Sequence, residues 1–213
     1  MRWDNLFDDL ESQLEHELGV EDLELRVEEE RLRLGRLSLR NRMRAASGVD
    51  EGRRAAPLRL WLVDGSTARL FPTTFGRDWV SGDLVADERE EMGAHRASVR
   101  ALVPLDAIAS VGLDDAQLAE SLHAEPDPDA SRTPDAAPRL IDRLGLAFAL
   151  RDLARRRSPL TVTTRSGVLH GTIDRVARDH FDLALHDPGS PRRPSNVRGT
   201  RIVPMASLIL VRV

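Results

Sequence analysis

The sequence predicts an α+β protein in which N-terminal helices are followed by two repeated small β-barrels, each preceded by a helix. The first observation is an internal repeat, because the segment 57–65 resembles 159–167, and Leu-Val-Pro-Leu at 102–105 resembles Ile-Val-Pro-Met at 202–205. The second is that aliphatic and polar residues alternate in both copies, as they do in half-buried strands. A repeat of this length fixes the architecture before any local detail, so two similar units are expected.

The repeat divides the chain into four parts. Residues 1–46 are predicted to be a helical segment, acidic at first and then arginine-rich, and residues 47–113 to be the first small barrel. Residues 114–138 have the composition of an acidic, proline-rich linker, which buries too little apolar surface to order itself. Residues 139–213 are predicted to hold a helix and the second, basic barrel.

Two helices are expected in the first part. A spacing of three and four between apolar residues predicts an amphipathic helix over residues 3–18, and we take its apolar stripe as a candidate interaction surface. A second helix is expected from about 21 to 46. Its heptad-like apolar residues leave two alternatives open: packing on its own domain, or a short coiled coil that dimerises. The stripe of the first helix consists of Trp3, Leu6, Phe7, Leu10 and Leu14.

The strands are predicted from alternation and from turn residues. In the first unit, Leu58, Leu60 and Leu62 alternate with other side chains before an Asp-Gly turn at 64–65. Further short strands are expected near 70–71, 79–80, 84–85 and 99–111. In the second unit we expect a helix that ends near 157, and then strands near 160–164, 169–176, 181–185 and 201–213.

Residues of the second unit carry a resemblance to Sm-like proteins. Gly167, Gly171, Ile173, Val176 and Leu183 resemble the first Sm motif, in which a glycine turn leads into a bent strand. The segment 203–208 is similar to the second motif in its bacterial host-factor form. The resemblance implies five-stranded Sm-like or SH3-like barrels, and two of them in one chain are expected to pack edge to edge, as Sm proteins do in rings.

The resemblance does not extend to the RNA site of Sm proteins. Where that family has an aspartate after the bent strand and a nucleotide-binding asparagine, this chain has Ala177 and Phe181. The first repeat also has no counterpart of Gly171 near residues 69–72. The overall layout, with a Trp-Asp start followed by paired repeats, also resembles an actinobacterial family that has no established activity.

Composition excludes several classes of protein. Cysteine is absent, which excludes disulfides and thiolate metal sites. The 31 basic residues are all arginine, which is typical of a GC-rich genome. No apolar run approaches the roughly 20 residues that cross a membrane, and the acidic start lacks the apolar region of a signal peptide. We therefore expect a soluble, cytoplasmic protein.

No catalytic or metal motif is present in the sequence. It has no glycine-rich phosphate loop, no His-Glu-x-x-His and no nucleophile elbow. His170, His180 and His186 lie within one stretch of the second unit, where they are expected to be exposed polar residues rather than metal ligands. The sequence therefore predicts a protein that is not an enzyme, with no cofactor and no metal.

Charge is distributed unevenly along the chain. Residues 1–30 carry 12 acidic side chains and 2 arginines, whereas residues 139–213 carry 14 arginines and 6 acidic side chains. Phosphate groups suit such arginines, but the only aromatic residues of this unit, Phe148 and Phe181, are expected in the core, which leaves none for base stacking.

Two functions follow from these patterns. The first is an interaction or scaffold module that binds a protein partner or associates with itself. The alternative is a nucleic-acid binder, for RNA or DNA, with little sequence preference and a regulatory role. Its candidate contacts are Arg155, Arg156, Arg157, Arg192, Arg193, Arg198 and Arg201.

Overall fold

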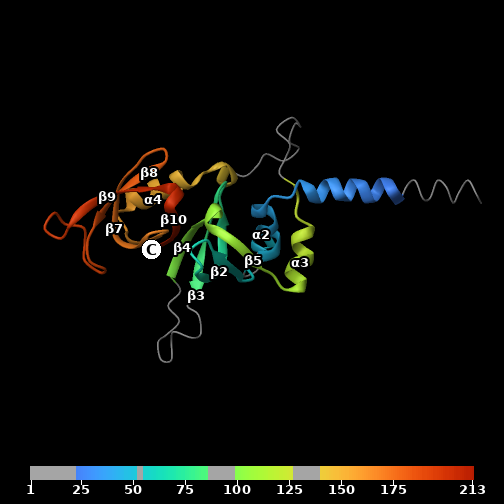
Figure 1. Cartoon of the computed structure of the whole chain (residues 1–213), viewed down its shortest axis with the longest axis horizontal. Helices are drawn as coiled ribbons and strands as arrows, with labels where there is room; N and C mark the ends of the chain where they lie inside the picture. Colours follow the sequence, from blue (N-terminus) through green and yellow to red (C-terminus); the bar gives the residue numbers. More distant parts are fainter. Residues whose placement is uncertain (1–22, 52–54, 86–98, 127–139) are drawn as a thin grey trace, which may run out of the picture.

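The structure is a computed structural model that describes residues 23–51, 55–85, 99–126 and 140–213. The predicted helix at 3–18, with its apolar stripe, lies outside the described residues. The fold is α+β, and its strands form one antiparallel sheet with the order β5-β1-β2-β3-β4-β10-β6-β7-β8-β9. Figure 1 shows the two halves of this sheet side by side, with the helix of residues 23–35 extending away from them.

The strands of the two halves follow the same order, which is the structural form of the sequence repeat. The first half is ordered β5-β1-β2-β3-β4 and the second β10-β6-β7-β8-β9. The strands of the first half are β1 Leu58–Leu62, β2 Thr67–Phe75, β3 Trp79–Val85, β4 Val99–Pro104 and β5 Ile108–Gly112. Those of the second half are β6 Pro159–Thr164, β7 Gly167–Val176, β8 His180–Leu185, β9 Gly199–Pro204 and β10 Leu208–Arg212.

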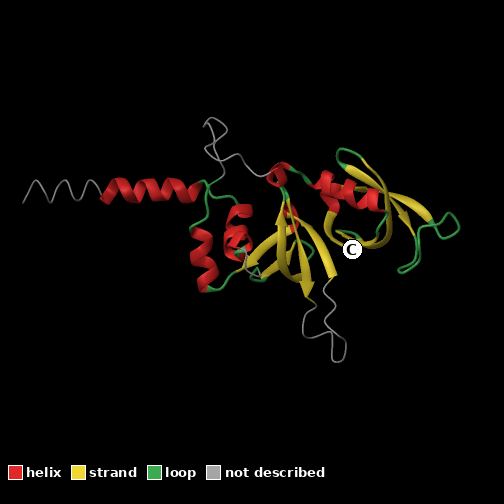
Figure 2. Ribbon diagram, turned by 180° about the vertical axis from the view of Figure 1, so that it is seen from behind, coloured by secondary structure: helices red, strands yellow, loops and turns green. Residues whose placement is uncertain are grey.

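The two repeated barrels predicted from the sequence are not confirmed by the sheet. The ten strands form a single sheet that does not close on itself, because β4 pairs with β10 of the other half and not with β5 of its own. The predicted strands near 79–80 and 84–85 are one strand, β3. Figure 2 shows the strands of the two halves next to each other, with helices beside each half.

The two halves bend at matching places. A bulge interrupts β2 between Pro72 and Thr74, and another interrupts β7 between Ile173 and Arg175. A Cβ on Gly171 of β7 would lie 2.2 Å from the carbonyl oxygen of Ala184. The first half does have a matching glycine, but on the neighbouring strand: a Cβ on Gly82 of β3 would lie 2.1 Å from the carbonyl oxygen of Phe71. Each bend therefore needs a glycine for close approach of two backbones.

Hydrogen bonds outside the sheet repeat as well. Short 3-10 turns, η2 Leu105–Ala107 and η4 Met205–Ser207, separate the last two strands of each half. The amide of Val63 donates to the carbonyl of Ala107, and the amide of Arg165 donates to that of Ser207, both at 3.0 Å. Position 100 in β4 thus corresponds to position 200 in β9, and the last strands match with the same offset.

The second predicted helix is broken in two. Residues 23–35 form one helix, and α2 (Leu39–Ser47) begins anew after residues 36–38. The break has a local cause, because the Ser38 side chain accepts a hydrogen bond from the amide of Asn41 and so caps α2. Gly48, with φ 62°, ends this helix in the left-handed conformation. The 3-10 turn η1 (Val49–Glu51) follows.

The predicted linker contains an ordered helix. Helix α3 (Asp115–Leu122) begins with a capping box, in which Asp114 accepts from the amide of Gln117 and the Gln117 side chain accepts from that of Asp114. It packs against α2, where Arg42 donates to the hydroxyl of Ser121 at 3.1 Å. The expectation of disorder is therefore wrong for this part, and residues 127–138 of the predicted linker lie outside the described residues.

The helix of the second half is shorter than expected. A 3-10 turn, η3 (Leu140–Arg143), precedes α4 (Leu146–Arg156), whose N-cap is Gly145. The indole of Trp79 donates to the carbonyl of Leu144 at 3.0 Å and holds this turn against β3. Helices α2 and α4 thus occupy the same place in the two repeats: Met43 of α2 is buried in the core of the first half, and Leu150 of α4 in that of the second.

Candidate functional site

Arg157 and Arg192 meet at one carboxylate, Asp174 of β7. Arg192 donates to both of its oxygens at 2.7 Å, and Arg157 donates to one of them at 2.9 Å. Arg157 also ends α4 with φ 55°, a conformation that usually favours glycine. Asp174 occupies the bulge of β7, which brings it within reach of the end of a helix and of a distant loop.

The two arginines change the acidity of the carboxylate between them. The hydrogen bonds from Arg192 hold the pKa of Asp174 below its usual value, and Arg157 adds to this effect, whereas partial burial opposes it. The same carboxylate raises the pKa of Arg192. The cluster therefore carries one negative and two positive charges at neutral pH.

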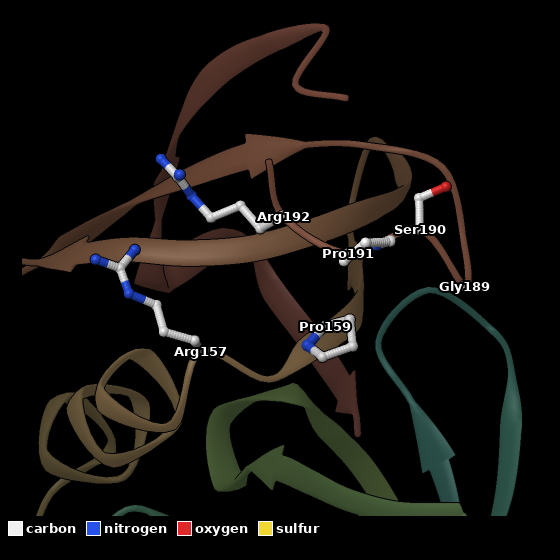
Figure 3. Close-up of a pocket in the computed structure, with 6 residues that line it drawn as sticks. All are labelled: Arg157, Pro159, Gly189, Ser190, Pro191 and Arg192. Carbon is white, nitrogen blue, oxygen red and sulfur yellow. The ribbon is translucent and has the colours of Figure 1, made fainter. Parts of the chain in front are cut away.

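A pocket of about 480 Å³ lies beside this cluster, between Arg157, Pro159 and residues 189–192. Figure 3 shows both guanidinium groups on one side of the pocket, with Ser190 and Pro191 away from them. Several of their donors are already directed at Asp174. The pocket is thus lined by cations whose charge is partly neutralised within the chain.

The other predicted arginines are divided among separate partners. Arg155 and Arg156 both contact Asp152, at 2.6 and 2.7 Å, and Arg198 contacts Asp187. Arg193 and Arg201 have no acidic partner in the part of the chain that the structure describes. Five of the seven candidate arginines therefore share their charge with carboxylates of their own chain, which weakens the phosphate-binding surface expected from the sequence.

The aromatic residues and histidines of the second half differ in burial. Phe181 is fully buried, as expected, but Phe148 is exposed on α4. His186 is buried and bonds to the hydroxyl of Thr172 at 2.9 Å, which corrects the expectation that it is exposed. His170 and His180 have separate partners elsewhere. In the described ranges no group of three acidic or histidine side chains is placed to hold a metal ion.

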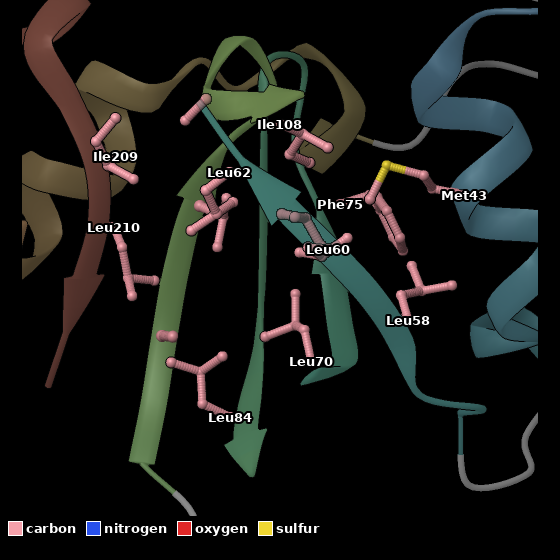
Figure 4. Close-up of a cluster of buried hydrophobic side chains, with 14 of the residues drawn as sticks. Met43, Leu58, Leu60, Leu62, Leu70, Phe75, Leu84, Ile108, Ile209 and Leu210 are labelled. Carbon is pink, nitrogen blue, oxygen red and sulfur yellow. The ribbon is translucent and has the colours of Figure 1, made fainter. Parts of the chain in front are cut away.

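The contact between β4 and β10 joins the halves, and we call these two strands the seam. Val211 lies opposite Leu102 and Arg212 opposite Ala101, and the amide of Val213 donates to the carbonyl of Arg100 at 2.9 Å. Side chains cross this seam in both directions. Ile209 and Leu210 of β10 enter the core of the first half, as Figure 4 shows, whereas Leu102 and Trp79 enter that of the second.

The strands at the two ends of the sheet, β5 and β9, correspond in the repeat to the two strands of the seam. Ile202 of β9 is 70% exposed, whereas Leu102, at the same position of β4, is only 6% exposed. Ala109 and Ser110 of β5 are exposed where Ile209 and Leu210 of β10 are buried. The sheet therefore exposes, at its two ends, the counterparts of the two strands that pair with each other in the seam.

Sequence reasoning did not single out Ile202. The signal was present in the repeat, because the segments 99–104 and 199–204 align and so predict the same strand twice. What the sequence does not reveal is which copy of that strand is covered, since coverage depends on long-range pairing.

Apolar residues are also exposed on the helix of residues 23–35. Leu23 and Val27, which belong to the predicted heptad pattern, are 62% and 61% exposed, so these residues do not pack on the body of the chain. The body holds the C-terminal end of this helix through Arg33, which donates to the carbonyls of Leu122 and Ala124. Packing on its own domain is therefore not what Leu23 and Val27 do, and self-association of the helix stays a prediction.

Comparison with known proteins adds no family to these observations. No protein-family model matches the chain, and no curated protein or solved structure matches it. Among the helices of the described residues, none has the length and apolar character needed to span a membrane. The sheet edges and the arginines are therefore the features that bear on function.

Proposed function

We propose that the protein is a non-enzymatic interaction module, built from two Sm-like or SH3-like units, that holds a protein partner at the ends of its sheet. The repeated strand order and the bent strands support the description of each half as such a unit. The observation that carries the proposal is the edge strand β9, where Ile202 is 70% exposed. An end strand offers unpaired backbone groups to which another strand can add.

The charge of the second half supports this function over nucleic-acid binding. Five of the candidate arginines are paired with carboxylates, and no exposed aromatic residue other than Phe148 is found in this half. Binding to a phosphate backbone draws on free cationic charge, and among the seven candidate arginines only Arg193 and Arg201 have no carboxylate partner in the described residues. Of the candidate contacts, these two side chains are the ones left to carry the alternative function.

The test is a photoreactive residue at position 202 of the full chain, introduced in cells. We expect cross-links to a polypeptide from 202 and none from 168. Val168 is the control, because it is 52% exposed but lies in β7, which is not an end strand of the sheet. Thr200→Pro should abolish the cross-link. Thr200 corresponds to Arg100, whose carbonyl bonds across the seam. The amide of the same residue faces the same side of an antiparallel strand, and proline removes this donor.

The opposite outcome is equally specific. If position 202 yields no polypeptide adduct, or if Thr200→Pro leaves the adduct unchanged, the edge is not the working surface. Gel shifts of the purified chain with single-stranded RNA and double-stranded DNA then address the alternative. Binding that falls steeply with salt and is lost in Arg193→Ala and Arg201→Ala would show that the protein is a nucleic-acid binder and not a protein-interaction module.

A further inference from the structure

The two end strands of the sheet are complementary to each other. The seam shows that a β4-type strand pairs with a strand of the β5 and β10 type in antiparallel fashion. Strand β9 is the second copy of β4, and β5 is the first copy of β10. A single chain thus carries one further strand of each type, and the two lie at opposite ends of the sheet, where they do not meet within the chain.

We infer that β9 of one chain binds β5 of a second copy of this chain, in the register of the seam. The inference rests on the proposed function and names its partner. In the seam, Leu102 lies opposite Val211. Replacing each of them by its counterpart in the other repeat places Ile202 opposite Val111 of the second copy. Ile202, exposed at 70% in the isolated chain, then becomes covered as Leu102 is.

Charge favours the same register. This register places Arg201 opposite Gly112 of the second copy, just as Ala101 lies opposite Arg212 in the seam. Asp114 follows two residues later, at the diagonal position from which long side chains on neighbouring strands interact. Arg201 has no acidic partner among the described residues of its own chain, so the second copy supplies one at the start of its α3.

The contact between copies is weaker than the seam. In the seam, β10 contributes Ile209 and Leu210 to the core of the first half. The corresponding residues of β5 are Ala109 and Ser110, which bring little apolar surface to a neighbour. The buried Phe181 also stands in the core of the second half where the first half has Val80, so that core is filled from within. Association through β9 and β5 is accordingly reversible, whereas the seam belongs to the folded chain.

The geometry also determines how copies add. One chain offers β9 at one end and β5 at the other, so the contact is head to tail rather than two-fold symmetric. Each added copy exposes a new edge of the same kind, and growth ends only where the rotation closes a ring. A head-to-tail assembly therefore grows with concentration, whereas a two-fold dimer stops at two chains.

Disulfide trapping tests this register, because the chain has no cysteine of its own. Purified Ile202→Cys and Val111→Cys variants are mixed and oxidised. We expect a disulfide-linked dimer from the mixture, because position 202 of one copy faces position 111 of the other. We expect none from either variant alone, since each carries only one of the two facing cysteines. Ile202→Cys mixed with Ala109→Cys is the register control and should not cross-link. A chain that carries both substitutions, 111 and 202, should form a ladder of linked species.

Sedimentation of the untreated full chain over a concentration series gives the second measurement. We expect the mass to rise with concentration, and Ile202→Asp to raise the dissociation constant by about tenfold or more, because a carboxylate is buried against an aliphatic side chain. Val168→Asp should leave association unchanged. Circular dichroism checks that each variant is folded.

Three results would overturn the inference. They are a mass that stays at one chain at every concentration, a dimer from Ile202→Cys alone, which indicates pairing of β9 with itself, and association that Ile202→Asp does not weaken. If the purified chain is monomeric but position 202 still cross-links to another polypeptide in cells, the second copy is the wrong partner and the proposed function stands. If 202 yields no polypeptide adduct in cells either, both fail.

Discussion

The seam and the outer edges use the same two strand types but treat them differently. In the seam, Leu102 and Ile209 are buried, and each enters the core of the half to which it does not belong. At the ends of the sheet, the corresponding Ile202 and Ala109 are exposed. An identical backbone pattern thus serves as a permanent joint in one place and as an open edge in another. The side chains, and not the strand order, distinguish them.

The difference has a physical cause in where the apolar area lies. Strand β10 presents aliphatic side chains on both of its faces, as its fully buried Ile209 and Val211 show. Strand β5 has only one apolar face, because Ala109 and Ser110 stand where β10 has Ile209 and Leu210. A strand with two apolar faces is stable only between two cores. The sequence of β10 therefore commits it to the middle of the sheet.

The largest predicted effect comes from truncating one side chain at matched positions. Leu102→Ala should lower the free energy of unfolding by about 2–5 kcal/mol, as a cavity in a core does. Ile202→Ala should change it by no more than about 0.5 kcal/mol, as at an exposed site. Urea unfolding at a low protein concentration measures both. Equal costs at the two positions would mean that the seam is no more tightly packed than the outer edge.

A smaller effect is expected at the bends that the halves share. Gly82→Ala and Gly171→Ala each place a Cβ against a backbone carbonyl at 2.1 and 2.2 Å, so the strands must separate. Each variant should lose about 1–3 kcal/mol of stability. Gly35→Ala is the control, because nothing lies within 4 Å of its Cβ. If thermal unfolding finds both β-strand variants as stable as the control, the bends do not depend on close backbone contact.

Much of the fold follows from local patterns. Alternation of aliphatic residues predicted the strands of both halves, and the repeat predicted that their order recurs. The break before α2 and the presence of α3 were missed, although Ser38 and the Asp114–Gln117 capping box are local signals. In both cases the composition of a long segment outweighed a cap of a few residues.

The candidate site was less predictable. Edge-to-edge packing was expected, but the sequence did not indicate that β4 would pair with β10 and leave β9 open. The arginines were expected to form a cationic surface, yet Asp174 and Arg192 are 18 residues apart and meet only because the bulge of β7 faces the loop before β9. Pairing across such distances depends on the tertiary structure and has no signature in spacing.

The smallest predicted effect concerns the residues at the two bulges, Asp174 in β7 and, at the matching position, Thr73 in β2. The pKa of Asp174 is lower in the folded chain than in the unfolded one. Asp174 therefore contributes stability at pH values above the pKa of an ordinary carboxylate, which is about 4. This contribution is lost as the pH falls through the folded pKa. Asp174→Asn should therefore cost about 1 kcal/mol at neutral pH and nothing in acid.

Hydrogen exchange of the amides in each half measures this last prediction. At neutral pH the variant should exchange faster in β7 and β8 than in β2 and β3, because the ion pairs that it loses lie at the bulge of β7. At the bulge of β2, Thr73 donates to the carbonyl of Ser81 and carries no charge. Asp187→Asn is the control, since Asp187 and Arg198 are both mostly exposed and their pair contributes little. Equal loss of protection in both halves would show that the cluster stabilises the sheet as a whole, with the seam transmitting its effect from one core to the other.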